Sequence, residues 1–156
     1  MAKAAKGTLI GRLQSAARQS RTALAARLLQ HGLYAGQDQI MLALHDTDGQ
    51  TPGNLAARLG VRPPTITKTI NRLQTQGFVA RQASEADSRQ AHVFLTDAGR
   101  DAIRLIEKSL RKTEKQAFRG LDKKEQKALL KVLLRIEANL NGAEPVEDPE
   151  LEDVEE

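Results

Sequence analysis

The chain has 156 residues, 40% hydrophobic but with only three Phe, one Tyr and no Trp, so an aliphatic core of packed helices is favoured. The absence of cysteine excludes disulfides, cysteine-bound zinc and thiol redox switches. No apolar run reaches the ~18 residues of a membrane span, and no signal-peptide pattern is found, so we expect a cytoplasmic protein without a membrane partner. Eight of the 20 acidic residues fall at 144–156, which leaves 24 basic against 12 acidic residues before that point. This excess favours a polyanionic partner, and a charge-solubilised surface is the plainer alternative.

The first two predicted elements are helices at about 8–30 and 35–45. Leucine and alanine recur at helical spacing through the first segment, with arginines between them, and His31-Gly32 supplies a stop. The second helix carries an apolar cluster from Ile40 to Leu44 and ends before the turn at 46–49.

Two short helices follow between 51 and 77. Thr51 and Pro52 are a typical helix start, and Gly60 ends that helix. Pro63-Pro64 then begins a helix that ends at Gly77. Its apolar residues, at 66, 70 and 73, recur at i, i+4 and i+7 and form one buried stripe.

The next segment predicts a β-hairpin, with one strand at 78–81, a polar tip at 84–88 and a returning strand at 91–95. A helix capped by Thr96 then runs to about residue 119. Asp122 and Glu125 have the spacing of a capping box for the last helix. That helix has a wide leucine-rich stripe, from Leu129 to Leu140, which suggests burial on two sides, as in a dimer. We expect disorder from 142 onward.

Two short helices and a hairpin predict a winged helix-turn-helix, within a mainly α fold with a small β-hairpin wing. The second helix of such a motif faces the major groove of DNA. With its apolar stripe turned inward, its outer face carries hydroxyls, an amide and two cations but no acid, which suits phosphates and base edges. The residues of this face are Pro64, Thr65, Thr67, Lys68, Asn71, Arg72 and Thr75. Its first turn should also offer free backbone N–H groups to a phosphate. The plainer alternative is a solvated helix face.

The segment Leu55-Ala56-x-x-Leu59-Gly60 and its continuation to Val79 resemble the helix-turn-helix of MarR-type transcriptional regulators. Asp87-Ser88-Arg89, followed by Leu95-Thr96-x-x-Gly99, is similar to the wing signature of that family. The resemblance implies an intertwined helical homodimer that binds a pseudo-palindromic operator. It assigns dimerisation to residues 1–34 and 100–141, DNA binding to 35–99 and an acidic tail to 142–156.

The resemblance also implies roles for individual residues. Arg89 would enter the minor groove, held by Asp87, and Thr51 would join the DNA-contacting residues already named. A local surface salt bridge between Asp87 and Arg89 is the plainer alternative. Family members commonly bind small aromatic or phenolic effectors, for which the candidate residues by position are Arg18, His31, Tyr34 and Met41.

We therefore predict a DNA-binding transcriptional regulator, acting as a repressor, whose effector would release it from DNA. The alternatives are a low-specificity architectural DNA-binding protein and a winged-helix adaptor that binds protein. The three histidines lack metal-site spacing, and no catalytic triad, phosphate loop or carboxylate pair is found, so we expect no metal, no cofactor and no enzymatic activity. The acidic tail would solubilise the chain, cover its basic face or contact another protein.

Overall fold

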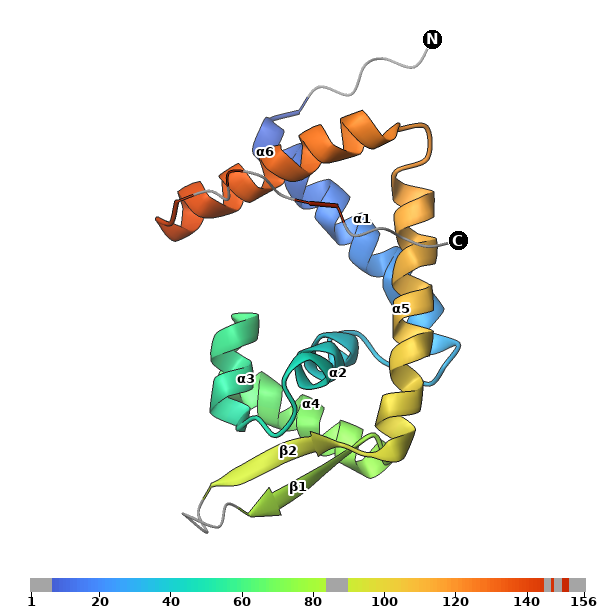
Figure 1. Ribbon diagram of the computed structural model, residues 1–156, viewed down its shortest axis with the longest axis vertical. Helices are drawn as coiled ribbons and strands as arrows, with labels where there is room; N and C mark the ends of the chain where they lie inside the picture. Colours follow the sequence, from blue (N-terminus) through green and yellow to red (C-terminus); the bar gives the residue numbers. More distant parts are fainter. Residues whose placement is uncertain (1–6, 84–89, 145–146, 148–149, 152–156) are drawn as a thin grey trace. The chain divides into compact units, whose positions relative to one another are not determined.

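A computed structural model describes residues 7–83, 90–144, 147 and 150–151. The chain forms six helices and a two-stranded antiparallel sheet within these residues (Figure 1). The elements, in chain order, are α1 (Leu9–Leu29), α2 (Gln37–Asp46), α3 (Pro52–Leu59), α4 (Pro63–Gln76), β1 (Val79–Ala83), β2 (Ala91–Leu95), α5 (Asp97–Ala117) and α6 (Lys123–Asn141). The mainly helical fold with a β-hairpin is therefore confirmed.

Most helix ends lie where the side chains predict them. The Thr8 and Thr51 hydroxyls accept hydrogen bonds from the backbone N–H groups of the first turns of α1 and α3. A capping box begins α6: the Asp122 carboxylate accepts from the Glu125 backbone N–H, and the Glu125 carboxylate accepts from the Asp122 backbone N–H. The second helix begins two residues later than predicted, at Gln37, because Gly36 has a left-handed backbone with φ of 87°.

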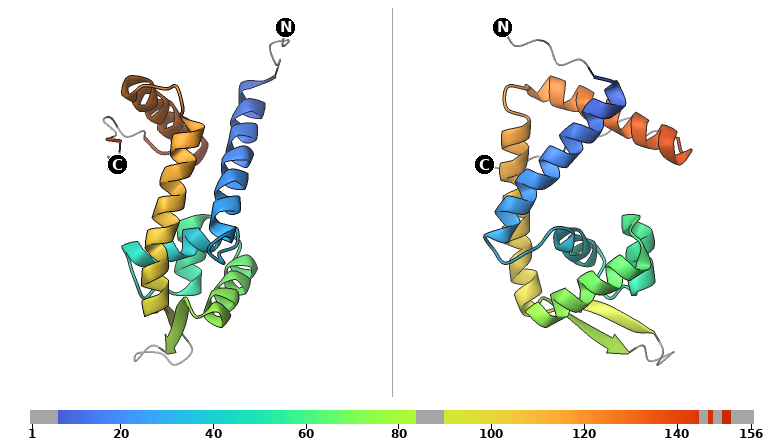
Figure 2. Two further views of the ribbon diagram at one scale, coloured as in Figure 1. Left: turned by 90° about the vertical axis from the view of Figure 1, so that its right-hand side faces the viewer. Right: turned by 180° about the vertical axis from the view of Figure 1, so that it is seen from behind.

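The chain divides into two compact units, residues 1–110 and 111–156. In the first unit, buried aliphatic side chains from α2, α3, α4, the hairpin and the start of α5 form one core. Leu28 near the end of α1 and Ile106 on α5 join the same core, so these helix segments pack together within this unit (Figure 2).

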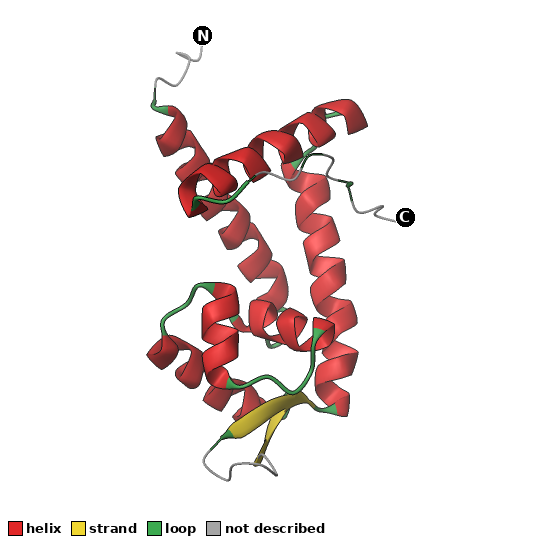
Figure 3. Cartoon of the chain, turned by 60° about the vertical axis from the view of Figure 1, so that its left-hand side comes forward, coloured by secondary structure: helices red, strands yellow, loops and turns green. Residues whose placement is uncertain are grey.

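The two strands pair with each other, and one bridge joins the hairpin to the segment before α3. Val79 pairs with Leu95 and Ala83 with Ala91, and Gln50 forms an isolated bridge with Val93. The strand β1 is longer than predicted because pairing with β2 extends it to Ala83. Figure 3 shows the strands beside the helices of this unit, with the hairpin tip outside the described residues.

The second unit contains the end of α5 and all of α6. A hollow of about 740 Å³ lies in this unit, lined in part by Phe118, Leu129, Leu130 and Leu133. Leu129, Leu130 and Leu133 are half buried in the single chain, and Val132 and Leu140 are 55% and 74% exposed. Much of the predicted acidic tail lies outside the described residues. No helix among the described residues is long and apolar enough to cross a bilayer.

Candidate nucleic-acid interface

Helix α4 has one buried side and one exposed polar side, as its spacing predicts. Ile66, Ile70 and Leu73 are at most 2% exposed and belong to the core. The other side is exposed throughout and carries Pro64, Thr65, Thr67, Lys68, Asn71, Arg72 and Thr75. The structure therefore brings the predicted α4 residues together on one surface.

The turn between α3 and α4 sets the direction of this surface. Gly60 ends α3 with a left-handed φ of 62°, and Val61 N–H bonds back to the Ala56 carbonyl. Thr51, the other predicted contact, is half buried, and its hydroxyl accepts from Asn54 N–H at 3.1 Å. In the structure, Thr51 therefore caps the start of α3.

The expectation that the start of α4 has free backbone N–H groups is wrong. Pro63 and Pro64 have no N–H to offer. The N–H groups of Thr65 and Ile66 both bond to the Arg62 carbonyl, at 3.0 and 3.1 Å. Phosphate contacts at this helix would therefore have to come from side chains.

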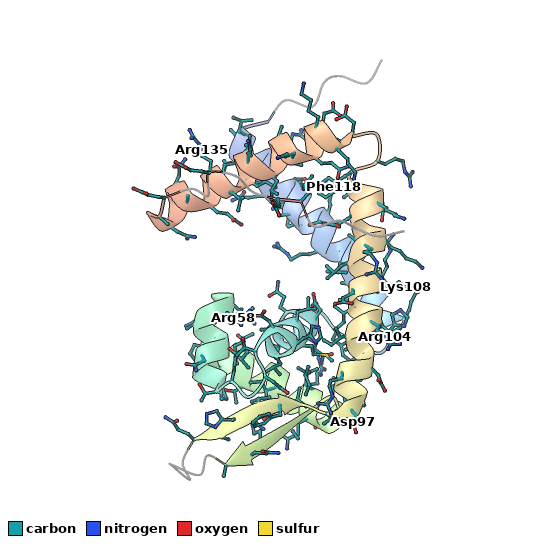
Figure 4. The ribbon with its side chains drawn as sticks, viewed as in Figure 1. Arg58, Asp97, Arg104, Lys108, Phe118 and Arg135 are labelled. Carbon is teal, nitrogen blue, oxygen red and sulfur yellow. The ribbon has the colours of Figure 1, made fainter. Side chains whose placement is uncertain are left out.

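Charge is distributed unevenly around this surface. No Asp or Glu occurs from 49 to 84, whereas five cationic residues do: Arg58, Arg62, Lys68, Arg72 and Arg81. Arg58 forms an ion pair with Asp46, and its hydrogen bond and charge lower the pKa of that carboxyl group. Figure 4 shows Arg58 on α3. The surface as a whole attracts polyanions.

Sequence reasoning missed Arg81, which links the hairpin to α4. Its guanidinium donates to Asn71 Oδ1 and to Gln74 Oε1, each at 2.7 Å. A signal for this contact exists in the sequence. Residues i and i+2 of a strand share a face, so Arg81 lies on the same face as the buried Val79.

The loop between α1 and α2 also contacts α4. The Arg72 guanidinium carbon lies 4.8 Å from the centroid of the Tyr34 ring, a cation–π contact. Gln76 donates to the Gly32 carbonyl and accepts from the buried Gln37, both at 2.7 Å. Two separate contacts therefore join this loop to the last turns of α4.

The candidate effector residues have different environments. Arg18 and His31 are exposed on and just after α1, and Tyr34 is 45% exposed beside Arg72. Met41 is fully buried in the core, so a ligand would reach it only by displacing its neighbours. Of these four residues, Tyr34 contacts α4, through Arg72, whereas Met41 lies in the core.

The predicted wing pair, Asp87 and Arg89, lies outside the described residues. Among the described residues, no group of three or more His, Asp or Glu side chains is placed to hold a metal ion. A helix-turn-helix with a polar, acid-free outer face, followed by a hairpin, defines a winged-helix protein of the DNA-binding class.

Comparison with known proteins agrees with this class. A sequence model that describes the MarR family matches residues 34–90 of the chain. The chain is 32% identical in sequence to transcriptional regulator PA3341, whose crystal structure matches with a TM-score of 0.75. The match covers 86% of this chain and 99% of that one. The chain therefore belongs to the MarR family and is a DNA-binding transcriptional regulator.

Two further structures share the fold at lower identity. A mutant MarR from E. coli complexed with operator DNA is 22% identical, with a TM-score of 0.75 and coverage of 81% of this chain and 92% of that one. BpsR from Bordetella bronchiseptica, whose DNA binding is regulated by 6-hydroxynicotinic acid, is 21% identical, with a TM-score of 0.75 and coverage of 83% and 99%.

Proposed function

We propose that the protein represses transcription by binding a pseudo-palindromic operator as a homodimer, with one α4 in each of two major grooves. The observation that carries this proposal is the exposed α4 surface, which has no acid and is surrounded by cations. The fold is shared with a MarR that was crystallised on operator DNA. Repression would follow from occupancy of a promoter rather than from catalysis, and a DNA partner implies a cytoplasmic location.

The α4 residues with a proposed contact divide into two groups by chemistry, and the wing adds a third. Lys68 and Arg72 would contact phosphates, whose negative charge supplies most of the sequence-independent affinity. Thr65, Thr67 and Asn71 would position the helix or contact base edges. Arg89, held by Asp87, would add a minor-groove contact from the wing.

The homodimer is supported by apolar residues that a single chain leaves exposed. Leu9 and Ile10 on α1 are 92% and 54% exposed, and Val132 and Leu140 on α6 are exposed to a similar degree. Clusters of exposed apolar side chains mark interaction surfaces in soluble proteins. We assign dimerisation to residues 1–34 and 100–141, and light scattering would measure the resulting mass.

A small aromatic or phenolic effector would act through the loop between α1 and α2. This loop holds Tyr34 against Arg72 and Gly32 against Gln76, so a ligand that moved it would also move α4. A ligand shifts DNA affinity only by the difference in its own affinity for the two states. BpsR, which shares the fold, is regulated by 6-hydroxynicotinic acid.

Selection of bound duplexes from a random pool, followed by sequencing, tests the proposal. A specific dimeric regulator enriches a pseudo-palindrome, with affinity that falls steeply as salt rises. Steep salt dependence without enrichment would indicate the architectural alternative. No binding at low salt would contradict DNA binding and leave the protein-binding adaptor.

A further inference from the structure

We propose that Arg81 is a specificity-determining residue that fixes Asn71 and Gln74 as hydrogen-bond donors, so that α4 reads acceptor atoms in the major groove. The inference rests on the proposed function and concerns which DNA chemistry the site selects. It depends on one contact, in which a single guanidinium from β1 bonds to two amides on α4.

The chemistry of arginine determines which way each amide is turned. A guanidinium has five N–H donors and no acceptor. The atom that faces it at 2.7 Å must therefore be an amide oxygen, and this settles the O and N positions of Asn71 and Gln74. Their NH₂ groups are turned away from Arg81.

The two amides are placed to act together. Asn71 and Gln74 are at positions i and i+3, so they are neighbours on the helix surface, and both are exposed. Arg81 itself is half buried, on the same strand face as the buried Val79. Its planar fork can bond two oxygens at once, which the single ammonium group of a lysine does less well.

This orientation limits the bases that Asn71 can recognise. A free asparagine pairs with adenine through two bonds, in which its oxygen accepts from N6 and its nitrogen donates to N7. That contact requires the oxygen and nitrogen to turn together onto one base. Arg81 takes one of the two lone pairs of the Asn71 oxygen and fixes the direction of the amide, so the outward NH₂ group suits adjacent acceptors, which guanine O6 and N7 provide.

The test compares base preferences of the full-length protein and of Arg81→Met, each measured by sequencing duplexes bound from the same random pool. Wild type should favour guanine at the base pair of each half-site that Asn71 contacts. Arg81→Met frees the amide, so the ratio of adenine to guanine there should rise roughly fivefold or more. Arg81→Lys keeps the charge but loses the fork, and it should relax the preference in the same direction while the salt dependence stays near that of wild type.

Two controls separate this role from charge and folding. Arg62→Met removes a cation from the same unit, at an exposed position before α4, and should weaken binding to all sequences alike. Asn71→Asp removes the donors and should abolish the preference at that position. Circular dichroism of each variant shows whether it is folded.

The outcomes distinguish failure of the role of Arg81 from failure of the proposed function. Enrichment by wild type with an unchanged preference in both Arg81 variants would overturn the role of Arg81 and leave the proposed function intact. No enrichment by wild type would overturn the proposed function and this inference together. A shift toward adenine in the Arg81 variants alone is the expected result.

Discussion

Replacement of Gly99 by alanine probes the corner where the hairpin meets α5. A methyl group at this position would overlap the carbonyl oxygen of Phe78 and lie 3.2 Å from both the Phe78 carbonyl carbon and Leu95 Cδ2. The carbonyl of Phe78 is held in place, because it accepts from Thr96 N–H at 3.1 Å. The glycine of the Leu-Thr-x-x-Gly motif is therefore required by close backbone approach, and not by its own φ.

The expected cost has two parts. Overpacking of a well-packed site costs about 1–3 kcal/mol, and loss of a backbone hydrogen bond costs about 0.5–1.5 kcal/mol. Gly99→Ala should therefore lower the free energy of unfolding by roughly 2–4 kcal/mol. For a chain of this size, each 1 kcal/mol lowers Tm by about 2–4 °C, so a fall of roughly 4–16 °C is expected.

Thermal unfolding followed by circular dichroism measures this effect, and Gly53→Ala is its matched control. A methyl group on Gly53 would meet only Thr51 Oγ1, at an ordinary 3.9 Å, on an exposed turn of α3. That variant should be unchanged or more stable by up to about 1 kcal/mol. Equal Tm values for Gly99→Ala and Gly53→Ala would refute the packing argument.

Three further predictions test single interactions. Burial raises the pKa of Asp38 in the folded protein above its ordinary value of 3.8. The folded state therefore loses stability relative to the unfolded state as pH rises from 3.8 through the higher pKa of the folded state. The stability of Asp38→Asn relative to wild type, measured by urea unfolding, should therefore increase as pH rises above 3.8, and a constant difference would contradict this. Tyr34→Leu should cost about 0.5–1 kcal/mol through loss of the contact with Arg72, whereas Tyr34→Phe keeps it; equal losses would exclude cation–π stabilisation. Asp122→Ala should cost about 1 kcal/mol by uncapping α6, and an unchanged Tm would contradict that contribution.

Local signals in the sequence predict most of the fold, because they act over a few residues. Thr51, Gly60 and Gly77 mark helix ends whose geometry depends on their own side chains or backbone. The apolar spacing of α4 likewise determines which of its sides is buried, and so which residues form the candidate interface. Residue type and periodicity were sufficient for these features.

Contacts between distant segments could not be predicted in this way. Gln37 and Gln76 are 39 residues apart, and nothing in their local sequence pairs them. Met41 is a candidate ligand contact by its position in the sequence only, and the sequence does not show that its side chain is fully buried in the core. For Arg81, strand periodicity indicates the face that it shares with Val79, but only the packing of β1 on α4 shows that two acceptors lie there.

The central claim is that the outer surface of α4 binds DNA, and charge reversal at Lys68 tests it most directly. Lys108 on α5 is an exposed lysine of the same chain (Figure 4), and its reversal changes the net charge equally. Affinity for the selected duplex is measured against salt for wild type, Lys68→Glu and Lys108→Glu. We predict that Lys68→Glu weakens binding far more than Lys108→Glu and reduces the slope of log K against log salt by about 0.9 or more. Equal losses of affinity in the two variants, with unchanged slopes, would contradict the assignment of α4 as the DNA-binding surface.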